Sequence, residues 1–347
     1  MNLSLVEKIA NTILYEGYIL YPYRPSSVKN QQRFNFGALC PQSYSLAQGG
    51  TERWSMQTEC LVQGSEHAVL NVKVRFLHLV AQEVGHLSTP LSELVDGVEP
   101  DFQIVQSLEV NGQIYQTWQE AIEREVSISN LNLHELLTQP EKRTFNYGSK
   151  REIERLHDQQ GKIVALFVRR QQSIEGRVDI EATQVGDQLF RITVRILNLT
   201  PFADAAQKSR DEALMRSFAS THTILELRDG EFVSLLEPPE AYSESVAACH
   251  NIGTWPVLVG EEGERNTILS SPIILYDYPQ IAPESPGDLC DATEIDEILT
   301  LRIMSLTDEE KREMRSGDER ARRILERTEA LPVEQLMKLH GRMRRLR

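Results

Sequence analysis

Alternating apolar and polar positions dominate the first two thirds of the chain and predict β-strands joined by turns. The clearest case is HAVLNVKVRFLHLV, residues 67–80, in which the apolar residues at 70, 72, 74 and 76 share one face of an extended chain. The preceding RWSMQTECLV, residues 53–62, has the composition of a second strand. Because QGSE separates the two runs, the pattern predicts a β-hairpin over residues 53–80.

Two more hairpins and one single strand are predicted by the same signals. Residues 175–201 predict a hairpin with its turn near Gly186. Residues 220–239 predict another, which turns at Arg228-Asp229-Gly230 and stops at two prolines. A strand is expected at Ile163–Val168.

Helical spacing of apolar residues predicts a helix over residues 2–14 and three internal helical stretches. The internal stretches are Trp118–Glu125, a helical turn within REIERLHDQQ at residues 151–160, and Asp204–Arg216.

The end of the chain is predicted to be helical. Thr307 and Glu310 form a capping box for one helix, and Asp318 can cap the next. Pro332 suits the first turn of a third. The expected fold class is therefore α+β: a β-rich body of antiparallel hairpins, sandwich or barrel-like, over residues 1–290, and a C-terminal helical segment over residues 291–347.

Composition and charge restrict the functions that fit this pattern. The chain has 347 residues, 40% of them hydrophobic, and a net charge of −14. Acidic and basic residues balance in 291–347, so the negative excess lies in residues 1–290. An acidic body repels phosphate backbones, so nucleic-acid binding is not expected. A basic partner surface would be attracted instead.

The N-terminus and the cysteines indicate a cytoplasmic location. Glu7 and Lys8 interrupt the N-terminal apolar run, which therefore does not fit a signal peptide. No apolar run reaches the length that membrane insertion requires. Four cysteines are too few for a disulfide scaffold in a chain of this size.

The stretch YEGYILYPYRPSSVKNQQRFNFG, Tyr15–Gly37, is the leading candidate for a binding site. Its prolines favour an edge strand over a central one, and cationic side chains follow. Tyrosine and arginine are enriched at protein interfaces, whereas half-buried core tyrosines are an equally good alternative. The candidate binding residues are Tyr18, Tyr21, Tyr23, Arg24, Lys29 and Arg33, together with Trp255 and Asp277 in a later segment rich in turns.

Motifs for metal binding or catalysis are weak. The cysteines and histidines show no C-x-x-C or H-E-x-x-H spacing, and G-x-S-x-G is absent. His222, Cys249 and His250 are weak metal candidates, and with Asp277 they could serve a hydrolase. Core cysteine and surface histidine are the simpler interpretation.

Three stretches together resemble a bacterial protein family encoded in nickel-iron uptake hydrogenase gene clusters. They are YEGYILYPYRPSSVKN near the start, the segment from NIGTWPVLVG to SLTDEEKREMR, and the closing RARRILERTEALPVEQLMKLHG. The resemblance implies an accessory role in hydrogenase assembly or operation. It brings no catalytic residues with it.

The sequence therefore favours a non-catalytic accessory or binding protein whose partner is a hydrogenase subunit or maturation factor, with no cofactor expected. One alternative is a metal-dependent hydrolase or another enzyme, so catalytic activity stays an open question. The other is a structural scaffold that forms oligomers through its C-terminal helices. Trp255–Asp277 is expected to contribute to the partner contact in the first case.

Overall fold

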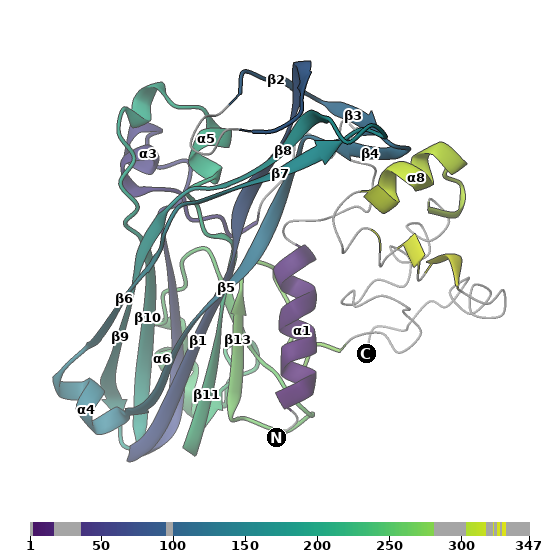
Figure 1. Ribbon diagram of the computed structural model, residues 1–347. Helices are drawn as coiled ribbons and strands as arrows, with labels where there is room; N and C mark the ends of the chain where they lie inside the picture. Colours follow the sequence, from purple (N-terminus) through teal and green to yellow (C-terminus); the bar gives the residue numbers. More distant parts are fainter. Residues whose placement is uncertain are drawn as a thin grey trace.

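A computed structural model describes residues 3–16, 36–94, 100–280 and 303–316, together with 322, 325, 326 and 328–330. Antiparallel strands dominate these residues and form one eleven-stranded sheet that does not close (Figure 1). The β-rich class is thus confirmed. The strands of this sheet are β1 Ser55–Leu91, β2 Gln103–Val105, β5 Trp118–Asn132, β6 Glu141–Tyr147, β7 Lys150–His157, β8 Ile163–Gln171, β9 Ile174–Gly186, β10 Leu189–Asn198, β11 Ala219–Val233, β12 Trp255–Leu258 and β13 Thr267–Ser271.

Short helices and one small hairpin complete the described chain. The hairpin consists of β3 Ser107–Val110 and β4 Gln113–Gln116. The helices are α1 Leu3–Glu16, α3 Gln42–Ala47, α4 Leu133–Thr138, η1 Ala205–Gln207, α5 Arg210–Leu214, η2 Glu240–Tyr242, α6 Ser243–Ala247 and α8 Asp308–Ser316. No helix among the residues described is long and apolar enough to cross a membrane.

Strand β1 forms the spine of the molecule. Along one edge it pairs with β11 and then with β8, and along the other with β10, β5 and finally β2. The lower half belongs to a body ordered β12-β13-β11-β1-β10-β9-β6. The upper half, with β2, β7 and β8, forms an arm that rises from the body (Figure 1).

The hairpin predicted at residues 53–80 is wrong, because QGSE lies inside β1 and the chain continues in the same direction. The third hairpin is wrong for the same reason, because Asp229 and Gly230 lie inside β11. These two turn-like sequences face each other, with Gly64 paired to Gly230 and a register shift directly after it. Both strands therefore use their turn residues to make a bulge.

Glycine is required at position 64 because the two backbones approach closely. A Cβ on Gly64 would lie 3.0 Å from the Cα of Gly230. The bulge lets β1 change partners on its other edge, where its pairing with β10 ends at Gln63 and its pairing with β5 begins at Val69.

Three helix predictions also need correction. Trp118–Glu125 is the start of β5, and residues 151–157 belong to β7. Both segments pair with long strands, and these ladders override their local helical spacing. The stretch 204–216 is split into η1 and α5, because Lys208 and Ser209 between them are extended and Ser209 caps the new helix. The hairpin of β9 and β10, strand β8 and helix α1 are confirmed.

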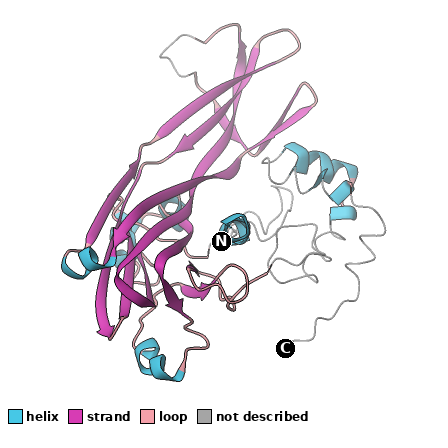
Figure 2. Ribbon diagram, turned by 90° about the horizontal axis from the view of Figure 1, so that it is seen from below, coloured by secondary structure: helices cyan, strands magenta, loops and turns pink. Residues whose placement is uncertain are grey.

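Helix α1 covers one face of the open sheet, as Figure 2 shows from below. Val6, Ile9, Ala10 and Ile13 form a buried cluster with residues of β11, β12 and β13. The helix therefore shields apolar side chains that the single-layered part of the sheet would otherwise expose.

The α8 helix begins with the predicted capping box. The backbone N–H of Thr307 donates to Glu310 Oε2 at 2.8 Å, and the N–H of Glu310 donates to Thr307 Oγ1 at 3.2 Å. The predicted caps at Asp318 and Pro332 lie outside the described residues, so the boundary at residue 290 stays a prediction.

A cluster of aromatic rings fills the core of the body where β1, β6 and β11 converge. The centroid of Phe218 lies 4.7 Å from that of Phe76 and 5.3 Å from that of Phe145. Tyr147 packs at the edge of this cluster. Its hydroxyl donates to the carbonyl of Glu125 at 3.0 Å, and this hydrogen bond links β6 to β5. The cluster therefore ties β6, whose backbone ladder is with β9, to β1 and to the start of β11.

Gly176 should be essential to this packing. A Cβ at this position would lie 2.3 Å from Phe145 and 2.7 Å from Phe218, so Gly176→Ala forces the rings apart. We expect it to lower the free energy of unfolding by about 1–3 kcal/mol in urea unfolding experiments. The matched control is Gly148→Ala, where the added methyl meets no atom within 4 Å. Equal stability of the two variants would contradict this packing.

Candidate ligand-binding pocket

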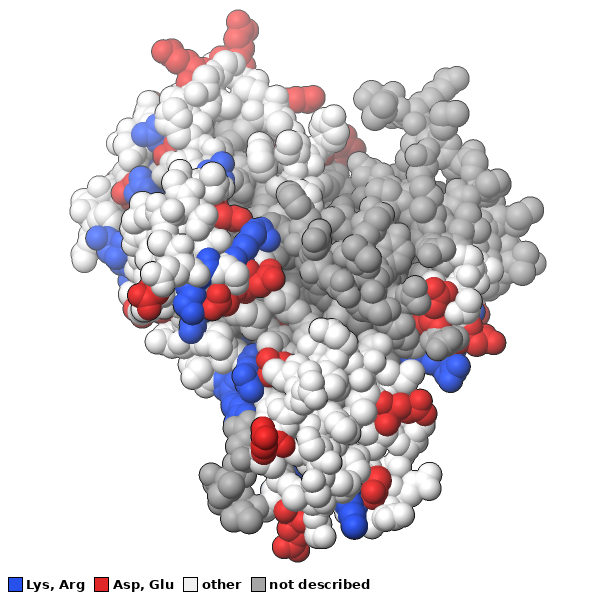
Figure 3. All heavy atoms as spheres, turned by 90° about the horizontal axis from the view of Figure 1, so that it is seen from above, with Lys and Arg blue, Asp and Glu red and all other residues white. Residues whose placement is uncertain are grey.

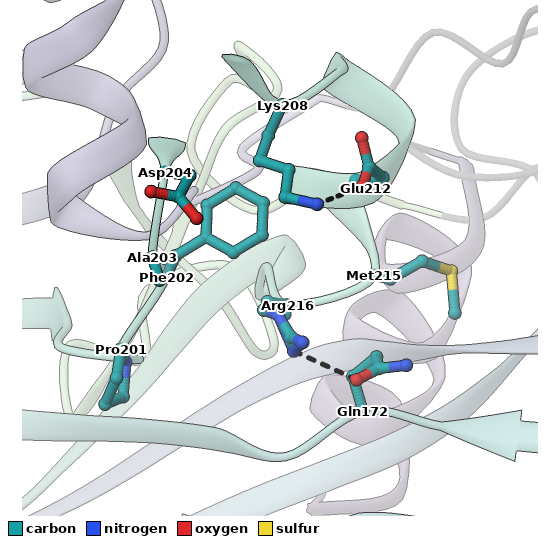
Figure 4. A pocket seen from close by; sticks show the side chains of 9 residues that line it. All are labelled: Gln172, Pro201, Phe202, Ala203, Asp204, Lys208, Glu212, Met215 and Arg216. Carbon is teal, nitrogen blue, oxygen red and sulfur yellow. Dashed lines mark hydrogen bonds and ion pairs between the residues drawn. The ribbon is translucent and has the colours of Figure 1, made fainter. Parts of the chain in front are cut away.

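A pocket of about 390 Å³ opens at the base of the arm (Figure 4). Its volume lies within the range of small-molecule sites. Two segments distant in sequence contribute to it: the residue after β8, and the continuous stretch from the turn after β10 through η1 and α5 to Arg216. The lining residues are Gln172, Pro201, Phe202, Ala203, Asp204, Lys208, Glu212, Met215 and Arg216.

Buried Asn198 ties the start of the second segment to its end. Its Nδ2 donates to the carbonyl of Arg216 at 2.9 Å and to that of Leu39 at 2.7 Å. Its Oδ1 accepts from the backbone N–H of Thr200 at 3.0 Å. Asn198 has no solvent exposure, so these bonds are shielded from water and fix the turn after β10 against the end of α5.

Arg216 is the main cation of the pocket. Its Nη1 donates to Gln172 Oε1 at 3.0 Å, and its guanidinium carbon lies 5.5 Å from the centroid of the Phe202 ring. Among the residues that the structure describes, no carboxylate lies within ion-pair distance of Arg216. Most of its five N–H donors thus stay available to a ligand.

The second cation, Lys208, is neutralised within the pocket. Its Nζ lies 2.8 Å from Glu212 Oε1, and Glu212 also accepts hydrogen bonds from the N–H and hydroxyl of Ser209. The hydrogen bond from Lys208, followed by those from Ser209, lowers the pKa of Glu212 to about 2. This carboxylate therefore stays ionised near neutral pH, and the pair contributes no net charge.

His78 holds the backbone of one lining residue, Gln172. Its side chain is fully buried, and Nε2 contacts the carbonyl oxygen of Gln172 at 2.9 Å. A carbonyl only accepts, so Nε2 carries the proton. Burial, and then the charge of Arg124, lower the pKa of His78 to about 4. A neutral His78 therefore anchors the backbone of the residue that orients Arg216.

The pocket is suited to binding more than to catalysis. Its lining contains no cysteine, histidine, serine or threonine, and its one strongly shifted carboxyl has moved away from neutral pH. Within the described ranges, no group of three or more His, Cys, Asp or Glu residues could hold a metal ion.

Viewed from above, charges of both signs are interspersed over the described surface (Figure 3).

Six of the candidate binding residues predicted from the sequence lie outside the described residues. They are Tyr18, Tyr21, Tyr23, Arg24, Lys29 and Arg33. Trp255 begins β12 and is 45% exposed. Asp277 accepts from the N–H of Leu258 at 2.8 Å and from the hydroxyl of Ser234 at 2.5 Å, so its carboxylate fastens its own segment to β12. Neither residue lines the pocket.

The weak metal candidates lie in different environments. His222 is fully buried on β11, and its Nδ1 donates to the carbonyl of Ser220 at 3.1 Å. Cys249 and His250 follow α6, where burial and then the charge of Glu59 raise the pKa of the Cys249 thiol to about 11. The backbone N–H of His250 donates to Glu59 at 2.7 Å. Neither the thiol nor the histidines are prepared for nucleophilic chemistry.

None of the pocket residues was singled out from the sequence. Only Ser209 and Glu212, spaced as a capping box, carried a readable signal. Gln172 and Arg216 are separated by many residues, and no local pattern indicates that they meet. No model of a known protein family and no curated protein matches this chain.

The buried histidines should make stability depend on pH. Burial lowers the pKa of His222, like that of His78, to about 4, below the usual value of 6.5. Between these values the unfolded chain binds more protons, so the free energy of unfolding should fall as the pH falls from about 6.5 to 4. At about 1.4 kcal/mol per pKa unit, the loss should amount to a few kcal/mol for the two sites.

Urea unfolding at pH 7, 6 and 5 measures this loss, and His78→Gln, whose amide can still donate to Gln172, should reduce it. His134→Gln is the control, because this histidine lies at the surface beside Glu66. NMR titration of His78 or His222 with a midpoint near 6.5 would contradict the burial seen here.

Proposed function

We propose that the protein is a non-catalytic accessory protein that binds another protein. The resemblance of three long stretches to a family from nickel-iron hydrogenase gene clusters suggests a hydrogenase subunit or maturation factor as the partner. The observation that carries the proposal is a group of exposed large apolar side chains on β12 and the segment that follows β13. We call this group the apolar strip: Trp255, Ile274 and Tyr276.

The apolar strip is firmly held yet exposed. Ile274 and Tyr276 are 71% and 77% exposed. Directly after them, Asp277 bonds to Leu258 through its side chain, and the N–H of Tyr278 donates to the carbonyl of Leu258 at 2.7 Å. These bonds fasten the segment to the β12 strand that also carries Trp255. Large apolar side chains presented on an ordered backbone lose little conformational entropy on binding.

The chemistry of the apolar strip fits a protein partner. Tryptophan and tyrosine are enriched among the residues that dominate binding energy at interfaces. The acidic residues of 1–290 would favour approach of a basic partner surface. The segment also lies within the second stretch that carries the family resemblance.

The alternatives have less support. A metal-dependent hydrolase would need His222, Cys249 and His250 to act together, whereas His222 is buried on β11 and the other two follow α6. Oligomerisation through the C-terminal helices depends on residues that lie mostly outside the described ranges.

Replacing the strip should weaken partner binding. We expect Trp255→Ala combined with Tyr276→Ala to reduce the amount of hydrogenase component co-purified from a native host by about tenfold or more, as loss of a hot spot would. The unfolding midpoint should change little, because both side chains are exposed. Ile153→Ala is the matched control, since Ile153 is 41% exposed on β7.

The proposal is wrong if the unmodified protein retains no hydrogenase subunit or maturation factor and its deletion leaves hydrogenase activity intact. Retention of the partner by the double variant at the unmodified level would remove the strip from the interface.

A further inference from the structure

Among the described residues, two groups of opposite charge in the pocket at the base of the arm have no ion-pair partner. Arg216 has no carboxylate within ion-pair distance, and Asp204 has neither a side-chain hydrogen bond nor an ion pair among the described residues. Lys208 and Glu212 neutralise each other. Within the part of the chain that the structure describes, the cavity therefore presents to a ligand one cation, Arg216, and one anion, Asp204, that are not ion-paired.

The apolar part of the lining lies beside these charges. Figure 4 shows the Phe202 ring near Asp204, with Arg216 beside the ring and Met215 on the side toward Glu212. Pro201 and Ala203 add further apolar surface. A ligand that satisfies the pocket thus needs a carboxylate, an ammonium group and an apolar side chain.

We propose that this pocket binds a small zwitterion, a free amino acid or dipeptide with apolar side chains. The guanidinium of Arg216, oriented by Gln172, receives the carboxylate in a two-bond contact. The carboxylate of Asp204 receives the ammonium group, and Phe202 and Met215 pack against the side chain. This site is separate from the apolar strip, so it does not depend on the proposed protein partner.

Arg216, which would bind the carboxylate, is held in position before a ligand binds. Gln172 is held by His78 through its backbone and holds Arg216 through its side chain. Asn198 fixes the backbone carbonyl of Arg216. Because these groups are ordered before any ligand arrives, binding does not have to immobilise the Arg216 side chain.

Isothermal titration calorimetry of the full chain tests the proposal with four probes. L-Leucine and L-leucyl-L-leucine carry both charges, L-leucinamide lacks the carboxylate, and N-acetyl-L-leucine lacks the ammonium group. Leucine or the dipeptide, or both, should bind saturably. Leucinamide and N-acetyl-leucine should each bind about tenfold more weakly than leucine, or worse, because each loses one charged hydrogen-bonded contact.

Variants assign each charge to its residue. Arg216→Gln should weaken leucine binding about tenfold while leaving leucinamide binding unchanged. Asp204→Asn should do the same for leucine while leaving N-acetyl-leucine unchanged, and asparagine tolerates the left-handed backbone at this position. Arg210→Gln is the control, because Arg210 pairs with Glu52 outside the pocket.

Three results would overturn the proposal. They are no saturable binding of leucine or dileucine at millimolar concentration, equal affinity for leucine and both analogues, and full discrimination between leucine and leucinamide in Arg216→Gln. If Arg216→Gln does not fold, as judged from its thermal unfolding, the analogues on the unmodified protein and Asp204→Asn still decide.

Discussion

The fold depends on one constraint: a single 37-residue strand, β1, must satisfy its backbone hydrogen bonds along both edges over its whole length. No one neighbour is long enough to do so. Five strands share the task, and each change of neighbour falls at a defined place. The opposed glycines at 64 and 230 make the lower change possible, because they allow two bulged backbones to approach each other.

The position of the pocket follows from the upper change of neighbour. On one edge of β1, pairing with β11 ends at Leu77, and pairing with β8 begins at Val80. His78 lies between them and bonds to Gln172, the first residue beyond β8. Arg216 lies just before the start of β11. The junction of body and arm therefore brings together the end of β8 and the start of β11. The residues beside these strand ends carry polar side chains, and the cavity lies between them.

Local chemistry made part of this structure readable from the sequence. The β9–β10 hairpin, strand β8, α1 and the capping box at Thr307 follow from alternation, helical spacing and short-range capping, all of which act within a few residues. The hairpins assigned at 63–66 and at 228–230 failed because the same Gly and Asp residues serve turns and bulges equally well. Only the partner strand decides between them, and that partner is distant in sequence.

The functional residues were harder to predict for the same reason. Trp255 was noted as a binding candidate and is exposed, whereas Asp277 proves to fasten the backbone. The pocket was missed, because Gln172, Asp204 and Arg216 have no common pattern. What makes Arg216 notable is that no carboxylate of the described residues lies within ion-pair distance, which only the folded arrangement reveals.

The most direct test of this account is the distance between spin labels at the two ends of the lower half of β1. Labels at Ser55→Cys and Lys73→Cys, with Cys249 and Cys290 replaced by serine, can be measured by double electron–electron resonance. A continuous strand with a bulge places the two positions more than about 35 Å apart, at about 3.3 Å per residue. A hairpin turning at Gly64 would bring them within about 20 Å, labels included. That distance would contradict the continuous β1 strand on which the body, the arm and the pocket depend.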